Sequence, residues 1–312
     1  MLQRVRFGRT ELQVSPAGLG CGGSSRLGLA TGGDERSAER LVRQALAKGV
    51  NFLDTARVYG TEEVVGRAIA SRRSEVVVSS KSLFTNKDGT YISVVDLVAS
   101  LEKSIKRIQS DYIDVFSLHG VTEKQLDYCL DEYIPELERQ KALGKIRHIG
   151  ITESFGQEPQ HEMLSRAIPI GCFDVVMVGF NFLNQTARKQ VLQLSIEHDV
   201  AVLVMHAVRR ALSNAERLRE IVVQLAGLGE VDPEIVDLSD PVGFLRESGE
   251  SITDIAYRYC RYETGVSVVL TGTGNPEHLE KNISAINGDP VPDSIRGQLD
   301  QAFGRVQSTS AD

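Results

Sequence analysis

Short apolar runs recur along the chain, and most of them are continuous rather than alternating with polar residues. They are Ala17–Cys21, Asn51–Asp54, Val76–Lys81, Tyr112–His119, His148–Thr152, Val175–Phe180, Ala201–His206 and Val266–Thr271. Continuous apolar runs are typical of strands that are buried on both faces, as in parallel sheets covered by helices. The pattern therefore predicts a set of buried parallel strands.

The segments between these runs carry apolar residues at helical spacing. The clearest stripes are Ala38–Leu46, Leu97–Ile108, Leu192–Ile196, Ile255–Tyr259 and the segment that Asn275-Pro276 opens as N-cap and first helical residue. Gly49 ends the first stripe, and a capping box of Ser93 and Asp96 opens the second. The segment Thr122–Leu143 contains Pro135, which must either break a helix or begin a second one.

Alternating strands and helices in a chain of 312 residues favour a closed (β/α)8 TIM barrel, with residues 1–312 as a single domain. The alternative is an open doubly wound sheet. In that fold a glycine-rich turn after the first strand leads directly into a helix. Here Gly18-Leu-Gly-Cys-Gly-Gly23 has glycines at that spacing, but it overlaps the first predicted strand and leads into a loop, not directly into a helix. The barrel is therefore preferred, and its active site is expected at the C-terminal ends of the strands.

Three further segments lie outside the regular repeat. Leu2–Phe7 and Leu12–Val14 flank a turn and predict an N-terminal β-hairpin. The connection Val208–Glu250, after the seventh strand, is unusually long and is predicted to carry a helix near Ala215–Leu225. The polar tail Gln307–Asp312 is expected to fray.

Composition narrows the class of protein. The net charge of −7 and the lack of a basic cluster argue against a nucleic-acid partner. Four scattered cysteines indicate free thiols, and neither they nor the histidines show a metal-ligand spacing. The first residues lack the apolar core of a signal peptide, and no run approaches the roughly 18 apolar residues of a membrane span. A cytoplasmic protein, monomeric or a small homo-oligomer, is expected.

Ionisable residues stand at or just after the ends of three predicted neighbouring strands. Asp54 ends one strand and Tyr59 follows it after a turn, while Lys81 and His119 end the next two. Tyrosine has an ordinary pKa of about 10, and a nearby ammonium such as Lys81 is expected to lower it. Asp54 could hold Lys81, and His119 could hydrogen-bond a substrate oxygen. Such a proton donor beside a carbonyl needs a hydride carrier, and this implies a nicotinamide cofactor.

Each of these residues also has a structural reading. Asp54 could cap a turn, Tyr59 could be a core tyrosine, and Lys81 and His119 could belong to structural ion pairs. Their convergence at three strand ends favours the catalytic reading. Arg209 and Arg210, at the start of the long connection, could grip a pyrophosphate, although exposed loop arginines usually do not.

Several motifs in the same order resemble the aldo-keto reductase family. They are Asp54-Thr-Ala-x-x-Tyr59-Gly60, Lys81 after a valine-rich strand, Leu118-His119, Gly144-Lys-Ile-Arg-His-Ile-Gly150 and Thr271-Gly-Thr-Gly-Asn-Pro-Glu-His-Leu-Glu-Lys-Asn282. The resemblance covers nearly the whole chain. It implies a barrel with a hairpin plug at its bottom and NAD(P)(H) bound over its top.

The resemblance also assigns roles. Tyr59 becomes the general acid and base, Asp54 and Lys81 tune it, and His119 orients the carbonyl. Cofactor-binding positions would be Gly20, Cys21, Gly22, Asp54, Thr152, Glu153, Met177, Met205, His206, Gly272, Thr273, Gly274, Asn275, His278 and Asn282. The positions from Gly272 to Asn282 match the segment that holds the adenosine phosphate in the family. A helix N-terminus in this segment suits an anion.

The sequence departs from the family at the nicotinamide. Thr152-Glu153 stands where the family usually has Ser-Asn, and Met177 stands where it has glutamine. Met205 corresponds to the residue that stacks on the nicotinamide. The arginine near the 2′-phosphate is replaced by Gly274 or His278, so NADP(H) and NAD(H) are both expected as cofactors.

The sequence leaves three hypotheses for function. The first is an NAD(P)-dependent oxidoreductase that acts on an aldehyde, ketone or sugar-like alcohol. The second is an enzyme that retains its cofactor for an internal redox step, such as epimerisation or dehydration. The third is a redox-sensing binding subunit with little turnover. The loops Ser24–Gly33, Phe84–Thr90 and Val208–Glu250 are expected to select the substrate.

Overall fold

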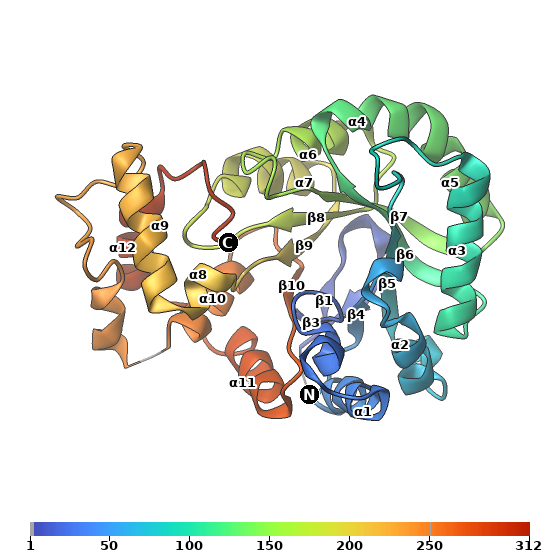
Figure 1. The fold of residues 1–312 in the computed structure, drawn as a ribbon, viewed down its shortest axis with the longest axis horizontal. Coiled ribbons are helices and arrows are strands. Elements are labelled where there is room, and N and C mark those ends of the chain that lie inside the picture. The colour runs from blue at the N-terminus through green and yellow to red at the C-terminus, as the bar shows by residue number, and fades with distance from the viewer. Residues whose placement is uncertain (1–2, 250) are drawn as a thin grey trace.

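The computed structural model describes residues 3–249 and 251–312, and for residues 246–248 it describes the backbone. Within these ranges eight parallel strands close into a barrel in the order β10-β3-β4-β5-β6-β7-β8-β9 (Figure 1). The strands are β3 Ala17–Gly20, β4 Phe52–Asp54, β5 Val77–Ser82, β6 Ile113–Val121, β7 Ile146–Glu153, β8 Val175–Gly179, β9 Ala201–Met205 and β10 Val268–Thr271. The predicted (β/α)8 barrel is confirmed, and the open sheet is excluded by the closure between β10 and β3.

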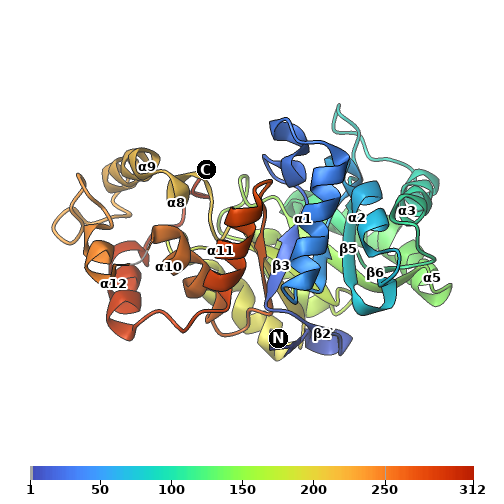
Figure 2. The same cartoon turned by 90° about the horizontal axis from the view of Figure 1, so that it is seen from below.

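Helices surround the barrel, as Figures 1 and 2 show from two directions. They are α1 Glu35–Ala47, α2 Glu62–Ile69, α3 Val94–Ile108, α4 Glu123–Tyr128, α5 Ile134–Ala142, α6 Glu162–Ala167, α7 Gln193–Glu197, α10 Ile252–Arg261 and α11 Pro276–Ile286. Ser93 and Asn275 cap α3 and α11 as predicted. Pro135 lies in the first turn of α5, which continues from α4 through one π-helical turn, so the proline begins a helix. None of the helices in the described residues is long and apolar enough to cross a bilayer.

Alternation along the strands separates the barrel interior from the layer beneath the helices. Phe52, Val77 and Val115 belong to the small interior cluster. Their strand neighbours, such as Leu53 and Val78, belong to the larger cluster between the strands and the helices. Every second residue of a strand therefore points into the barrel, and this parity decides which side chains can reach a site at its mouth.

The N-terminal hairpin closes the bottom of the barrel, as predicted. It consists of β1 Val5–Arg6 and β2 Gln13–Val14, while Leu2, the first residue of the predicted strand, lies outside the described residues. Phe7 is fully buried in the interior cluster, with its ring centroid 5.3 Å from that of Phe52. The hairpin thus fills the space that the lowest interior side chains leave.

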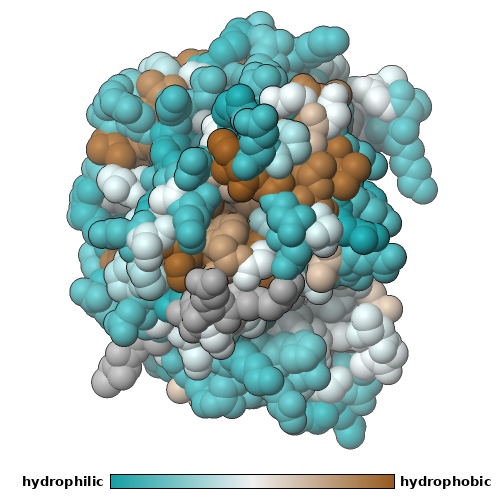
Figure 3. Space-filling model, turned by 90° about the vertical axis from the view of Figure 1, so that its left-hand side faces the viewer, coloured by the Kyte–Doolittle hydropathy of each residue, from teal (hydrophilic) through white to brown (hydrophobic). Residues whose placement is uncertain are grey.

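The long connection after β9 forms a lobe beside the barrel with α12 Asp293–Phe303. It carries α8 Arg210–Ser213, α9 Ala215–Gly227 and a 3₁₀ helix at Gly243–Ser248, and its predicted end, Glu250, is not among the described residues. The predicted helix is confirmed, because α9 covers the predicted range and buries one apolar face, formed by Leu218, Ile221, Val222 and Leu225. Figure 3 shows this end of the molecule, where apolar residues interrupt a mostly hydrophilic surface.

The tail does not fray, and the prediction for Gln307–Asp312 is wrong. The Glu230 carboxylate accepts hydrogen bonds from the backbone N–H groups of the first two tail residues. Ala311 is fully buried, and its carbonyl accepts a hydrogen bond from Ala211 N–H of α8. The tail therefore folds back onto the lobe, and its last residue reaches the mouth of the barrel.

Candidate active site

A buried ion pair lies at the C-terminal ends of β4 and β5. Lys81 Nζ donates to both oxygens of Asp54, at 2.6 and 2.7 Å, and to the Thr55 carbonyl at 2.9 Å. Asp54 Oδ1 also accepts from the Ser79 hydroxyl at 3.0 Å. Strand parity explains why the two side chains meet inside the barrel. Asp54 follows the interior Phe52 by two residues, and Lys81 follows the interior Val77 by four.

Tyr59 lies over this pair at the end of a 3₁₀ helix, Arg57–Tyr59, that follows β4. Lys81 Nζ is 5.1 Å from the centre of the Tyr59 ring, and the Tyr59 hydroxyl is 3.4 Å from His119 Nε2. A Cβ at Gly22 would lie 2.6 Å from the same ring, so glycine there makes room for the tyrosine. The structure thus brings together the four residues that the sequence analysis selected.

The pKa of Tyr59 departs from expectation. Burial raises the pKa of its hydroxyl above the ordinary value, and the charge of Lys81 offsets this only in part. The expectation that Lys81 would bring the pKa of Tyr59 below its ordinary value is wrong, because desolvation outweighs the ammonium. Tyr59 is therefore protonated at neutral pH and can donate a proton.

Lys81 is charged despite its burial. Burial alone lowers its pKa, but the Asp54 carboxylate in direct contact more than compensates, so that the pKa is raised. This fixes a positive charge beneath the Tyr59 ring.

His119 is neutral. Burial, with a contribution from the charge of Lys81, lowers its pKa to about 3. Its Nδ1 atom is buried and has no hydrogen-bond partner among the described residues. A neutral imidazole beside the Tyr59 hydroxyl can donate or accept a hydrogen bond at Nε2 without adding charge.

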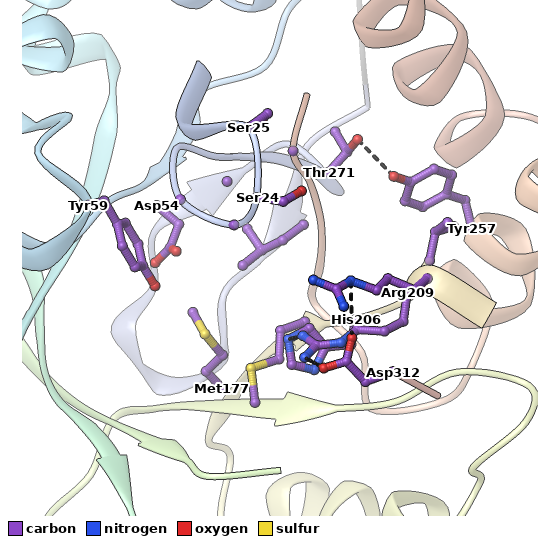
Figure 4. Close-up of a pocket in the computed structure, with 18 residues that line it drawn as sticks. Ser24, Ser25, Asp54, Tyr59, Met177, His206, Arg209, Tyr257, Thr271 and Asp312 are labelled. Carbon is purple, nitrogen blue, oxygen red and sulfur yellow. Dashed lines mark hydrogen bonds and ion pairs between the residues drawn. The ribbon is translucent and has the colours of Figure 1, made fainter. Parts of the chain in front are cut away.

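A cavity of about 480 Å³ opens beside Tyr59 at the mouth of the barrel (Figure 4). Seven of the positions predicted to bind cofactor line it: Gly20, Gly22, Asp54, Met177, Met205, His206 and Gly272. The backbone approaches closely here, since a Cβ at Gly272 would lie 3.1 Å from the Gly20 carbonyl oxygen. The two methionines give one wall an apolar, polarisable surface.

Three predicted positions on the strands or directly after them do not line the cavity. Cys21 is fully buried, and the Thr152 hydroxyl accepts a hydrogen bond from Gly120 N–H at 2.8 Å. Glu153 follows the outward-facing Ile151 by two residues and also points outward. Its carboxylate contacts His161 Nδ1 at 2.8 Å and Gly179 N–H at 2.7 Å. The predicted strand ended at Thr152, one residue before Glu153, so this orientation was not foreseen.

The predicted adenosine-phosphate segment lies next to the cavity. Its Gly274 packs against the loop after β3, since a Cβ there would lie 2.4 Å from the Cα of Gly28. The Asn275 side chain already accepts hydrogen bonds from the first N–H groups of α11, at 2.8 and 3.3 Å. Thr273, exposed His278 and Asn282 complete the segment, and Asn282 donates to the Thr271 hydroxyl at 2.9 Å.

Other cavity residues were not selected as cofactor-binding positions, although Arg209 and Arg210 were considered for a pyrophosphate and the loops from Ser24 and Val208 for the substrate. They include Ser24, Ser25, Val208, Arg209, Arg210, Tyr257 and Asp312. The Arg209 guanidinium donates to His206 Nε2 and, at 2.7 Å, to the Asp312 carboxylate. The Tyr257 hydroxyl lies 2.9 Å from that of Thr271. The dipeptide Arg209-Arg210 was a visible signal, whereas nothing in the polar tail pointed to Asp312.

Comparison with known proteins gives relatives of matching length. The chain is 26% identical to the uncharacterised oxidoreductase YqkF of Bacillus subtilis over 92% of both proteins. It is 29% identical to L-galactose dehydrogenase of Arabidopsis thaliana, over 90% of this chain and 86% of that protein.

Solved structures show the same fold. The holo form of aldo-keto reductase AKR11C1 from Bacillus halodurans has a TM-score of 0.75 at 23% identity, covering 99% of this chain and 98% of that one. An aldo/keto reductase from Klebsiella pneumoniae in complex with NADP and acetate has a TM-score of 0.68 at 23% identity, covering 97% and 96%. The model of the aldo/keto reductase family matches residues 19–302. The chain therefore belongs to the aldo/keto reductase family of NAD(P)-dependent oxidoreductases, as the sequence motifs predicted.

Proposed function

We propose that this protein transfers hydride between a nicotinamide cofactor and the carbonyl or alcohol of a small substrate, with Tyr59 as the general acid and base. The observation that carries the proposal is the buried Lys81–Asp54 pair beneath a protonated Tyr59 at the edge of a cavity. A bound nicotinamide would supply the hydride, which no side chain can supply.

The side chains divide the proton chemistry among them. The Tyr59 hydroxyl donates its proton to the substrate oxygen in reduction and takes it back in oxidation. The fixed charge of Lys81 stabilises the phenolate that forms, because the pair is shielded from water. Neutral His119 lies within hydrogen-bond reach of the Tyr59 hydroxyl and can hold the substrate oxygen beside it.

The cavity fits a dinucleotide in part. Gly20 and Gly272 leave a narrow cradle that side chains would fill, and Arg209 and Arg210 present cations suited to phosphates. Arg209 Nε is buried and has no hydrogen-bond partner among the described residues, which leaves a donor for an anion. The carboxamide position fits less well, because Glu153 points out of the barrel and the Thr152 hydroxyl is already engaged.

Small aldehydes, ketones and sugar-like alcohols are the proposed substrates. Support comes from relatives, which include L-galactose dehydrogenase and, at 24% identity, L-glyceraldehyde 3-phosphate reductase of Escherichia coli. The mouth of the barrel offers serine hydroxyls at Ser24 and Ser25 beside cationic Arg210, groups that can hydrogen-bond a polyhydroxylated substrate.

The test is a panel of aldehydes, ketones and aldoses assayed with NADPH and NADH, and of the corresponding alcohols with NADP and NAD. Cofactor absorbance reports turnover. At least one substrate class should give turnover that Tyr59→Phe abolishes. Activity that persists unchanged in Tyr59→Phe, or none with any pair while the cofactor binds, would contradict the proposal.

A further inference from the structure

The wall of the cavity opposite Tyr59 holds a small charged cluster built on Arg209 (Figure 4). Arg209 donates to His206 on one side and, at 2.7 Å, to the Asp312 carboxylate on the other. Asp312 also lies 3.6 Å from the guanidinium of Arg210. Two adjacent cations that face a cavity are therefore partnered by a carboxylate from the tail.

His206 cannot act as the cationic partner of this carboxylate. Burial and the neighbouring charge of Arg209 lower its pKa to about 3, so it accepts a hydrogen bond from the arginine as a neutral ring. The Asp312 carboxylate is therefore the charged partner of the Arg209 guanidinium at the cavity.

The tail that carries Asp312 is attached outside the cavity. Glu230, at the end of the α9 region, accepts hydrogen bonds from the N–H of Gln307 at 3.0 Å and of Ser308 at 3.2 Å. The Asn184 side chain donates to the Thr309 carbonyl at 2.8 Å. Asp312 itself has 46% of its side chain exposed, although Arg209 holds its carboxylate and Arg217 donates to its main-chain oxygen at 2.9 Å. Exposed ion pairs of this kind are weak, so another anion that binds the arginine more tightly can replace the carboxylate.

We propose that residues 307–312 form a latch, in which Asp312 occupies the anion position of Arg209 and must leave it before a dinucleotide phosphate can bind there. The proposal rests on the proposed function, since it assumes that the cavity takes a dinucleotide. A phosphate placed beside the bound carboxylate would meet like charge, whereas displacement of Asp312 frees Arg209 and Arg210 for a charge-assisted contact.

Calorimetric titration with NADPH tests the latch directly. Asp312→Asn removes the competing charge and keeps the shape of the side chain. We expect it to lower the Kd for NADPH about three- to tenfold, in keeping with a single charge-assisted pair. Glu230→Gln loosens the tail from outside the cavity and should lower the Kd in the same direction by a smaller factor.

A matched control separates the latch from a general change in net charge. Asp237 lies on the lobe, where it caps its own turn with Ser239 and lines a different cavity. Asp237→Asn makes the same charge change and should leave the Kd unchanged. A Kd that is equal or higher in Asp312→Asn than in the wild type would overturn the latch, as would an equal effect of Asp237→Asn.

Inorganic pyrophosphate, titrated in parallel, distinguishes failure of the latch from failure of the proposed function. If pyrophosphate binds more tightly to Asp312→Asn while no variant binds NADPH, the latch stands and the dinucleotide reading fails. If NADPH binds to the wild type and to Asp312→Asn with equal affinity, the proposed function stands and the latch fails. If neither probe binds to any variant, both are overturned.

Discussion

The two sides of the barrel mouth are built in different ways. On the side of β4 to β6, Asp54, Lys81 and His119 all stand on inward-facing positions of neighbouring strands. On the side of β7 to β9, Glu153 points outward, and the polar wall comes from the loop after β9 and from the tail. One side is assembled by strand geometry and the other by contacts between segments distant in sequence.

This difference teaches where a site can be expected to be rigid. Side chains on strand ends are positioned by the sheet and by burial, and the Lys81–Asp54 pair is almost inaccessible. The Arg209–Asp312 pair is held by a surface segment and is partly exposed. We expect the first side to be essential for stability and chemistry, and the second to adjust when ligands bind.

The largest effect should come from Lys81→Met, which leaves the Asp54 carboxylate buried without its partner. The expected loss is about 3–5 kcal/mol in the free energy of unfolding, because an unpaired buried charge keeps its desolvation penalty. Urea denaturation measures it. The matched control is Lys145→Met, whose ion pair with Glu102 is partly exposed and should be worth less than about 1 kcal/mol. Equal losses in the two variants would contradict the account of the buried pair.

A smaller effect is expected at the buried pair outside the barrel. Glu153→Gln weakens the contacts with His161 and Gly179, and should cost about 1–3 kcal/mol of stability. Because Glu153 does not line the cavity, the Kd for NADPH should stay within about a factor of three, or roughly 0.6 kcal/mol. A large loss of cofactor affinity without loss of stability would restore the sequence-based expectation that Glu153 binds the nicotinamide.

The last effect is a pH dependence of stability that both sides share. His119 and His206 have folded pKa values of about 3, against an unfolded value of about 6.5. Between these pH values the unfolded chain binds protons that the folded one does not, so stability falls as pH falls from about 6.5. Replacing either histidine with asparagine should flatten the slope by up to about 1.4 kcal/mol per pH unit. Urea denaturation at pH 4.5 to 7 would show it, and unchanged slopes in both variants would contradict the lowered pKa values.

Much of the fold was accessible from the sequence, because buried parallel strands leave continuous apolar runs. The helix α6, with six residues, was missed since so short a segment carries little periodicity. The tail was misjudged because its composition is polar, while the contacts that order it come from Glu230 and from α8, far away in the sequence.

The catalytic side of the site was also predictable. Ionisable residues at inward-facing positions near the C-terminal ends of neighbouring strands, such as Asp54, Lys81 and His119, must lie close together at the mouth of the barrel. The departure at Glu153 was visible, but its consequence was not, because β7 continues to Glu153 and keeps it on the outward face. The pKa of Tyr59 could not be foreseen either, since it depends on how far burial outweighs the charge of Lys81. That a single domain spans residues 1–312 and that the protein is cytoplasmic remain predictions.

The central claim is that Tyr59 gives the proton and the cavity binds the cofactor independently of it. The most direct measurement is a single-turnover experiment, in which a preformed complex of Tyr59→Phe with NADPH is mixed with a reactive aldehyde. The account predicts a Kd close to that of the wild type and a hydride-transfer rate about 10²- to 10⁴-fold lower, the range for loss of a general acid. Hydride transfer at the wild-type rate from that complex would contradict it.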